Sequence, residues 1–164
     1  MQILHHDQIK VRIQRLAIEI LENNLEEKEI ILAGINTSGF VFAELIFEEL
    51  NKKKLIPITL TRIHLNPAQP LSHPIEVEKE IHYYHGKTII VIDDVANTGR
   101  TIFYACKPFL DVIPKKIEVA VLVDRSYKSF PIKVDYMGLS LATTFQENIK
   151  ANLKDLNNIT VDMH

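Results

Sequence analysis

The amino-acid sequence predicts an α/β fold with a doubly wound, mostly parallel sheet and helices on both faces. Three observations support this prediction. Short apolar runs rich in β-branched residues stand at 28–35, 87–93 and 117–123, and such runs are typical of buried strands. Segments with helical periodicity lie between strands, and this alternation implies parallel pairing. With 164 residues, the chain is long enough to bury a core as one domain over 1–164.

The first half of the chain supplies two predicted helices and two predicted strands. A helix is predicted over 7–23, with Asp7 as its N-cap, because apolar residues recur there at spacings of three and four. The run KEIILAGI at 28–35 is predicted to be a buried strand that ends at a glycine and an isoleucine. A second helix over about 40–53 and a second strand over 55–61 follow.

The second half begins with a long segment that lacks periodicity. Residues 64–86 contain three prolines within eight residues and are predicted to form a flexible loop, which at this length is usually functional or disordered. KTIIVID at 87–93 is the clearest buried strand of the sequence. A helix over about 98–110 and strands over 117–123 and 133–137 complete the predicted fold.

Composition restricts the partners of the protein. Lys and Arg number 19 and Asp and Glu 21, so the net charge is −2, and the pI is near 6.4. This balance argues against a nucleic-acid partner. The sequence has neither an apolar run of 18 residues nor a signal-peptide core, so we expect no membrane partner and a cytoplasmic location. The single cysteine, Cys106, excludes an internal disulfide and fits a reducing compartment.

The strongest chemical signal is IIVIDDVANTGRT at 89–101. Two adjacent carboxylates, Asp93 and Asp94, stand at the end of an apolar strand. A loop of small polar residues follows, and a helix begins near Thr98 and Gly99. Ligands of open α/β sheets bind beyond the carboxyl ends of strands, where loop amides and a helix N-terminus suit phosphate. The carboxylates suit ribose hydroxyls or a metal ion. The segment therefore predicts a phosphate and a sugar diol bound side by side.

The residue pattern alone leaves a purely structural alternative open. In this alternative, Asp93 and Asp94 end a strand and cap a helix, while Thr98 and Gly99 form a turn. Two other phosphate-binding patterns are excluded, because neither G-x-x-x-x-G-K-[ST] nor G-x-G-x-x-G occurs in the sequence.

Three segments carry a family resemblance. VIDDVANTGRT at 91–101 resembles the phosphoribosyl-pyrophosphate (PRPP) signature of type I phosphoribosyltransferases. AGINTSGF at 33–40 is similar to the pyrophosphate-binding loop of that fold, and VLVDRSYKSFPIKVDYMG at 121–138 resembles the region that ends in the nucleobase hood. Within the superfamily, the chain is most similar to the bifunctional pyrimidine operon attenuator and uracil phosphoribosyltransferase family. The resemblance implies the type I fold with a flexible loop and a small C-terminal hood.

The resemblance also implies roles for the matching positions. Asp93 and Asp94 would be catalytic and would hold the ribose hydroxyls of PRPP, directly or through Mg²⁺, the implied cofactor. Arg62 would be a third catalytic residue, as a cation for pyrophosphate, and the loop 64–86 would be a flap over the reacting centre. The remaining implied positions are Ala96, Asn97, Thr98, Gly99, Arg100 and Thr101 for the 5′-phosphate, Asn36, Thr37, Ser38 and Gly39 for pyrophosphate, and Tyr136 and Met137 for the base.

The implied activity is transfer of the 5-phosphoribosyl group of PRPP to a nucleobase, with uracil as the favoured acceptor and pyrophosphate as the second product. The implied partners are PRPP, a nucleobase or nucleotide, and further copies of the chain in a homodimer or higher homo-oligomer.

The sequence departs from the family pattern at three places. The pyrophosphate loop reads INTSG, where the attenuator-type relatives usually carry basic side chains. TRIHL at 61–65 stands in place of an Arg-Asp-Asp type sequence. Asn97 stands where hypoxanthine-guanine enzymes use an aspartate on the purine N7 proton, and this disfavours a 6-oxopurine substrate. The neutral loop leaves a non-catalytic regulator that senses PRPP or nucleotides as an alternative, and the charge balance disfavours an RNA-binding attenuator.

Overall fold

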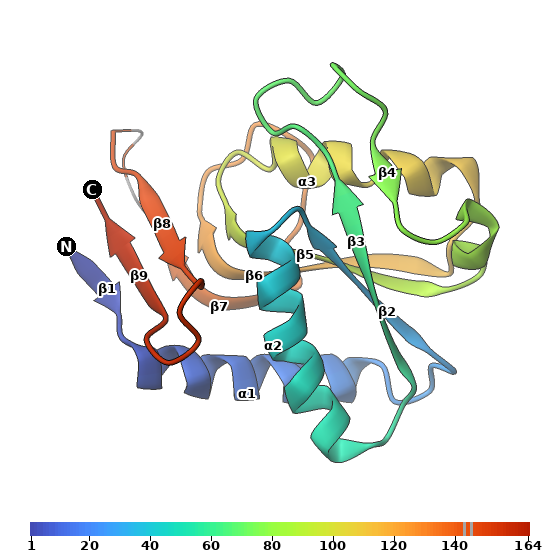
Figure 1. Ribbon diagram of the computed structural model, residues 1–164, viewed down its shortest axis with the longest axis horizontal. Coiled ribbons are helices and arrows are strands. Elements are labelled where there is room, and N and C mark those ends of the chain that lie inside the picture. The colour runs from blue at the N-terminus through green and yellow to red at the C-terminus, as the bar shows by residue number, and fades with distance from the viewer. Residues whose placement is uncertain (143, 145) are drawn as a thin grey trace.

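The computed structural model describes residues 1–142, 144 and 146–164. Within them, six strands form a central sheet in the spatial order β4-β3-β2-β5-β6-β7 (Figure 1). These strands are β4 (Glu76–Val77), β3 (Ile58–His64), β2 (Ile30–Ile35), β5 (Thr88–Ala96), β6 (Lys116–Arg125) and β7 (Tyr136–Leu141). Every neighbouring pair is parallel except β3 and β4, which are antiparallel. The predicted α/β class and mostly parallel sheet are confirmed.

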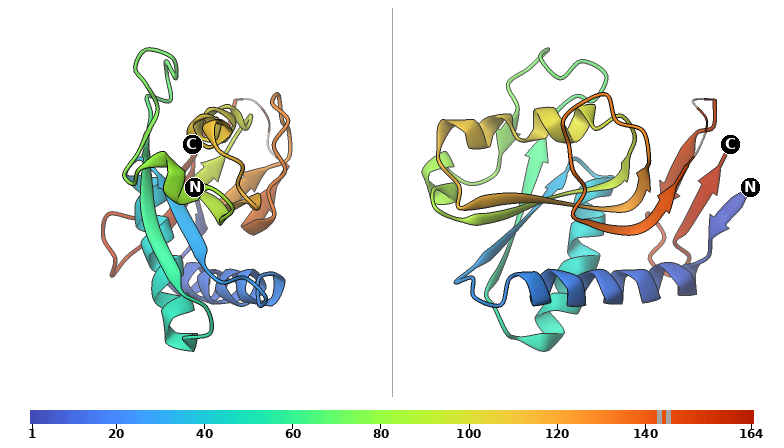
Figure 2. Two further views of the ribbon diagram at one scale, coloured as in Figure 1. Left: turned by 90° about the vertical axis from the view of Figure 1, so that its right-hand side faces the viewer. Right: turned by 180° about the vertical axis from the view of Figure 1, so that it is seen from behind.

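Helices cover both faces of this sheet, as the views in Figures 1 and 2 show. One face carries α1 (His6–Asn23) and α2 (Ser38–Lys53), and the other carries α3 (Arg100–Ala105) with the 3-10 helices η1 (Ile81–Tyr84) and η2 (Lys107–Asp111). The sheet separates two hydrophobic cores, and every residue of β2 is buried. Leu32 packs into the core on the α1 and α2 side, and Ile31 packs into the core on the α3 side. Among the described residues, no helix is long and apolar enough to cross a bilayer.

The chain ends meet in a second, three-stranded antiparallel sheet, which we call the hood. Its order is β1 (Gln2–Leu4), β9 (Thr160–Met163) and β8 (Ile149–Asn152). The amino group of Met1 donates to the carbonyl oxygen of Met163 over 2.7 Å. Figure 1 shows both ends of the chain side by side at this sheet, beyond the β7 edge of the central sheet. The hood thus combines the first strand of the chain with the last two.

Several element boundaries differ from the predicted ones for local reasons. The N-cap of α1 is His5, whose backbone N–H donates to the Gln8 side chain, so Asp7 lies in the first helical turn instead. β3 begins only after Pro57, which has no N–H for the sheet. The helix predicted over 98–110 divides into α3 and η2, because Pro108 cannot continue an α-helix.

The segment predicted as one long loop over 64–86 is partly ordered secondary structure. Its second half contains β4 and η1, and Tyr84 is fully buried with its hydroxyl 2.8 Å from that of Thr61. Its first half is held against the start of α3, where the Arg100 guanidinium donates to the carbonyl oxygens of Pro67 and Ala68 over 2.6 and 3.3 Å. The loop prediction therefore holds for the first half and was wrong for 76–77 and 81–84.

Candidate active site

A cleft of about 420 Å³ opens at the carboxyl ends of β2 and β5, where open α/β sheets bind their ligands. Four parts of the chain meet around it: the loop after β2, the end of β5 with the start of α3, the long loop at Pro67, and hood strand β8. The lining residues are Ile35, Asn36, Thr37, Ser38, Pro67, Asp93, Asp94, Val95, Asn97, Thr101, Ile149, Lys150 and Ala151. The structure thus brings together members of both predicted phosphate loops and both predicted carboxylates.

The acidic pair Asp93 and Asp94 is half-buried at the end of β5. The two backbone N–H groups that follow hold the carboxylates in place. The N–H of Asp94 donates to Oδ1 of Asp93 over 2.9 Å, and that of Val95 donates to Oδ1 of Asp94 over 2.9 Å. Burial, and after it the neighbouring Asp94 carboxylate, raise the pKa of Asp93 well above its usual range. Among the described residues, no Lys, Arg or His forms an ion pair with either carboxylate.

This pair has the donor chemistry that Mg²⁺ requires. Magnesium prefers oxygen ligands and is usually held by one or two carboxylates together with substrate phosphates. Two carboxylates side by side without a described counter-charge would both be stabilised by a divalent cation. Asp93 and Asp94 therefore fit the metal role that the sequence predicts.

The loop between β5 and α3 encloses a small cavity of about 40 Å³ lined by Asp93 and by residues 95–102. Gly99 has φ +89°, in the left-handed region that other residues rarely adopt, and it starts α3 by accepting a hydrogen bond from the N–H of Phe103. The carbonyl oxygen of Thr98 accepts hydrogen bonds from the N–H groups of Ser129 and Phe130. The loop therefore takes its shape from Gly99 and is held in place by hydrogen bonds from the segment at 129–130. The Arg100 side chain points out of this loop and donates to carbonyl oxygens of the long loop.

The loop after β2 contains Asn36–Gly39 and is fixed in two directions. Asn36, with φ +52°, donates its N–H to the Ile63 carbonyl oxygen over 2.8 Å and accepts at Oδ1 from the N–H of Leu65 over 3.0 Å. Both groups therefore join the loop to the end of β3. Gly39 lies so close to β5 that a Cβ there would stand 2.7 Å from the Ile92 carbonyl oxygen. This close approach places Thr37 and Ser38 in the same cleft as Asp93.

Arg62 lies outside the cleft. Its guanidinium stacks over the ring of Phe40, 4.1 Å from the centroid, and its Nε lies 3.8 Å from a carboxylate oxygen of Glu78. Among the described residues that line the cleft, the basic side chain is that of Lys150 in the hood. The structure does not bring the Arg62 side chain into the cleft, and its role as a cation for pyrophosphate stays a prediction.

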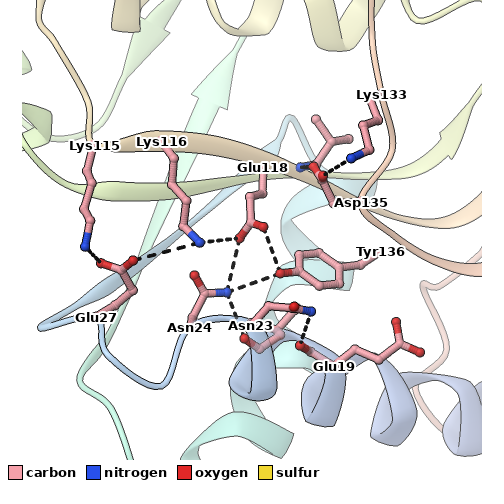
Figure 3. Close-up of polar contacts among 12 residues, drawn as sticks. Glu19, Asn23, Asn24, Glu27, Lys115, Lys116, Glu118, Lys133, Asp135 and Tyr136 are labelled. Atoms are coloured by element: carbon pink, nitrogen blue, oxygen red, sulfur yellow. Dashed lines mark hydrogen bonds and ion pairs between the residues drawn. The ribbon is translucent and has the colours of Figure 1, made fainter.

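The predicted base-contacting residues are also displaced from the cleft. Tyr136 is 2% exposed, and its hydroxyl donates to Glu118 over 3.0 Å and accepts from Asn24 Nδ2 over 3.3 Å (Figure 3). Asn24 lies at the carboxyl end of α1, so the Tyr136 ring belongs to the α1 side of the core. Burial, with Glu118 as a further cause, raises the pKa of the Tyr136 hydroxyl. Met137 packs into the core on the opposite face. Neither side chain lines the cleft, so the structure does not bring these two predicted residues to the site.

Hood strand β8 supplies the wall that the sequence prediction missed. Ile149, Lys150 and Ala151 line the cleft, and Ile149 and Ala151 are both buried in the core on the α1 and α2 side. The signal that could have found this strand is the alternation of apolar residues in NIKANL at 148–153. Its partner β9 carries ITVDM at 159–163, with the same alternation.

Arg125, at the end of β6, joins the phosphate loop to the segment before the hood. It is 4% exposed, and its guanidinium donates to Asn97 Oδ1 over 3.1 Å and to the Thr144 carbonyl oxygen over 2.6 Å. Lys128 forms a 2.7 Å ion pair with Asp124 and donates to the Arg125 carbonyl oxygen. The end of β6 is therefore tied to the loop between β5 and α3 and to the segment that precedes β8.

Together, the fold and the cleft define an α/β protein with a carboxylate pair, a glycine-containing loop that encloses a small cavity, and a separate capping sheet at the carboxyl ends of its strands. The family model described as phosphoribosyl transferase domain matches residues 1–154. The chain belongs to the phosphoribosyltransferase family, and the family resemblance predicted from the sequence is confirmed.

Two relatives share about a third of their residues with this chain. It is 33% identical over 158 residues to the bifunctional protein PyrR of Alkaliphilus metalliredigens, covering 90% of this chain and 85% of the relative. It is 34% identical over 166 residues to the bifunctional protein PyrR of Bacillus pumilus, covering 94% and 91%.

Solved structures show the same fold at lower sequence identity. The hypoxanthine phosphoribosyltransferase of Trypanosoma cruzi has a TM-score of 0.78 at 16% identity, over 98% of this chain and 94% of that one. A hypoxanthine-guanine phosphoribosyltransferase of Bacillus anthracis has a TM-score of 0.72 at 21% identity, over 88% and 84%. At these identities, the structures support the fold and carry no argument about the base.

Proposed function

We propose that this phosphoribosyltransferase transfers the 5-phosphoribosyl group of PRPP to a nucleobase, with uracil as the favoured acceptor, and releases pyrophosphate. The observation that carries this proposal is the meeting of Asp93, Asp94, Thr37, Ser38 and the loop 95–101 around one cleft. The similarity to proteins named PyrR over most of the chain supports a pyrimidine base rather than a purine.

The chain's own residues match the charges of this reaction. Cleavage of the bond between C1′ and pyrophosphate builds positive charge on the ribose and negative charge on the leaving group. The carboxylates of Asp93 and Asp94 would bind the ribose hydroxyls and stabilise the positive ring, and the loop 96–101 would hold the 5′-phosphate with backbone amides. Mg²⁺ held by the same carboxylates would neutralise the leaving group when bound.

Pyrophosphate would lie against the loop after β2. Thr37 and Ser38 would contribute hydroxyl and backbone donors there, whereas the amide and side-chain oxygen of Asn36 are already engaged with β3 and the long loop. We assign the positive charge near the leaving group to Lys150, because it lines the cleft and Arg62 does not. The base would then lie against Ile149 and Ala151.

A non-catalytic sensor of PRPP or nucleotides is the second candidate function. The observation that favours it is the neutral side chains of Asn36 and Ser38 in the loop that would face the most highly charged part of PRPP. Such a sensor would bind PRPP and release no pyrophosphate with any base.

One pair of measurements tests both candidates. Calorimetric titration with PRPP and Mg²⁺ should show binding, and absence of binding at millimolar PRPP would refute both. A pyrophosphate-release assay over uracil, cytosine, orotate, hypoxanthine, guanine, xanthine and adenine should then show turnover with uracil. Binding without release for any base would select the sensor. Replacing Asp93 and Asp94 together by Asn should abolish binding while circular dichroism shows an unchanged fold.

We also propose a homodimer or larger homo-oligomer. Three large apolar side chains on the edge formed by α3 and η2 and the turn that follows support self-association, since Phe103, Leu110 and Ile113 are 42%, 77% and 75% exposed. Light scattering after size-exclusion chromatography should show a mass above the 18.8 kDa of one chain.

A further inference from the structure

The outward side of α1 carries an apolar stripe that is open to solvent. Val11, Ile18 and Leu25 recur at intervals of seven residues, and they are 56%, 45% and 59% exposed. An interval of seven residues returns to nearly the same side of an α-helix, so Val11 and Ile18 lie in one row, and Leu25 follows in the turn after α1. The buried residues of α1 pack into the core on the other side of the helix. The stripe is therefore separate from the contacts that hold α1 on the sheet.

The stripe is also separate from the cleft and from the exposed apolar edge at α3 and η2. None of its residues lines the cleft. α1 covers one face of the sheet, and α3 and η2 cover the other, as Figures 1 and 2 show. A groove of about 320 Å³ adjoins the stripe at Val11, and its lining residues are Asp7, Gln8, Val11, Arg12 and Arg15. A row of exposed apolar side chains beside a groove is typical of a protein–protein contact.

Exposed charged side chains beside the stripe are distributed unevenly along it. Lys10 and Arg15 precede Ile18, whereas Glu22 and Glu26 follow it. Within the described part of the chain, none of these four residues forms an ion pair. Arg15 and Glu22 are seven residues apart, which is about 10 Å along the helix axis and too far for an ion pair within α1. Both ends of the stripe therefore carry charge that a partner could neutralise.

The other charged residues of α1 do not oppose this pattern. Arg12 and Glu19 are half-buried, and the Arg12 guanidinium donates to the Gly138 carbonyl oxygen. Asp7 lies in the first turn of α1, before the stretch that begins at residue 10. Between residues 10 and 26, the exposed charge beside the stripe is positive before Ile18 and negative after it.

We propose that this side of α1 packs against α1 of a second copy of the chain, antiparallel and about a two-fold axis at Ile18. The inference rests on the homo-oligomer proposed above and assigns it a face apart from the α3 and η2 edge. Val11 and Leu25 lie seven residues to either side of Ile18, so this axis sets Val11 of one copy against Leu25 of the other. Leu25 then enters the groove beside Val11, and the two Ile18 side chains meet at the axis.

The same axis brings opposite charges together. Arg15 stands three residues before Ile18 and Glu22 four residues after it, so each Arg15 comes next to Glu22 of the other copy. Lys10 and Glu26 stand eight residues before and after Ile18, and they meet in the same way. A parallel arrangement in register would set each charge against its own counterpart, which is unfavourable. The charges therefore select the antiparallel arrangement.

The size of this interface implies a weak dimer. α1 has 18 residues and is therefore about 27 Å long. One pair of helices of this length buries less surface than a standard interface of about 1,600 Å², and small interfaces are usually transient. We therefore expect a dissociation constant in the micromolar range, where charge and shape both contribute measurably.

Sedimentation velocity at increasing protein concentration tests the arrangement. The parent should show an association step between about 1 and 200 µM. Ile18→Glu places two carboxylates together at the axis, and Arg15→Glu and Glu22→Arg each set like charges together at two symmetric places. Each of these three variants should weaken the step at least about tenfold. The double variant, Arg15→Glu with Glu22→Arg, exchanges the charges within each pair and should restore the association to within about threefold of the parent.

Lys133→Glu is the matched control. It makes the same charge reversal as Arg15→Glu on a side chain that is 88% exposed and lies away from α1 in Figure 3. Its association should equal that of the parent. All variants should stay folded by circular dichroism and should keep the parental PRPP affinity, because none of the substituted residues lines the cleft.

The outcomes separate this inference from the homo-oligomer on which it rests. If the parent is monomeric at the highest concentration, both are refuted. If the parent associates and none of the α1 substitutions weakens the step, another face, such as the edge with Phe103, carries the association, and this inference alone is overturned. If the single charge reversals weaken the step and the double variant does not restore it, Arg15 does not face Glu22, and the antiparallel arrangement is overturned.

Discussion

Substitution of Gly39 by alanine tests whether the contact between α2 and β5 positions the loop 36–39, the proposed site for pyrophosphate. A Cβ at this position would lie 2.7 Å from the Ile92 carbonyl oxygen and 3.2 Å from the Asp93 Cα. Both are backbone atoms, so no side chain can rotate away, and the start of α2 must move off β5. Overpacking of this kind costs about 1–3 kcal/mol. Because about 1 kcal/mol shifts the melting temperature of a chain this long by about 2–4 °C, we expect a loss of about 2–12 °C.

The same displacement should reach the ligand. Thr37 and Ser38 precede Gly39 directly and line the cleft with Asp93. A misplacement of about 1 Å can cost about a hundredfold in rate. We therefore expect Gly39→Ala to lower PRPP affinity in titrations with Mg²⁺, and turnover with uracil to fall by about that factor. Both are measured at a temperature at which circular dichroism shows the variant folded.

Gly86→Ala is the matched control. Gly86 has φ +70°, so alanine is strained by about 1–2 kcal/mol, yet no other residue would lie within 4 Å of the Cβ that alanine adds. It precedes β5 at the end away from the cleft. The control should lose stability and keep PRPP affinity. If Gly39→Ala binds PRPP as tightly as Gly86→Ala does, the packing of α2 on β5 does not position the loop.

Three further results are expected. Asp93→Asn should lower PRPP affinity with Mg²⁺ at least about tenfold. It should also raise the melting temperature of the ligand-free protein at pH 7, because the raised pKa of Asp93 means that its ionised form destabilises the folded state at that pH. A lower melting temperature would contradict this. Lys150→Met should raise KM for PRPP about tenfold with a smaller effect on uracil binding, checked by initial rates. Burial raises the pKa of the Cys106 thiol from 9.0 to about 11. Iodoacetamide at pH 8 should therefore react more slowly with the folded than with the unfolded protein. The free energy of unfolding should also fall as the pH rises from about 9 to 11.

The parts of the fold that could be predicted from the sequence are those whose signal is local. β2, β5 and β6 are continuous apolar runs because both of their faces are covered, and α1 and α2 have a regular apolar face. The hood strands carry a weaker local signal, a short alternation of apolar residues, and the sequence prediction missed them. β1, β8 and β9 have three or four residues each, and β1 is stabilised by pairing with residues at the other end of the chain.

The candidate site divides in the same way. Asp93 and Asp94 lie near the carboxyl end of β5, and the segments predicted to bind phosphate directly follow β2 and β5, so the rule that ligands bind at carboxyl strand ends led to residues that line the cleft. The same rule misplaced Tyr136, because the strand predicted over 133–137 put it near a carboxyl end, whereas Tyr136 is the first residue of β7 and its ring packs toward α1. Lys150 and the contact between Arg125 and Asn97 join segments far apart in sequence, and no local pattern reports such contacts.

The hood has a consequence for the order in which the protein is completed. Its middle strand, β9, lies within the last residues of the described chain. β1 is synthesised first and has no partner strand until β9 has been made. Domains fold as the ribosome releases them, and joining distant segments carries an entropic cost of loop closure. The loops after β2 and β5, with Asp93 and Asp94, are therefore synthesised before the hood strand that forms the opposite wall of the cleft. A chain clipped before β9 would lose the partner strand of that wall and, with Val161, part of the core against α1 and α2, although the loops after β2 and β5 remain in its sequence.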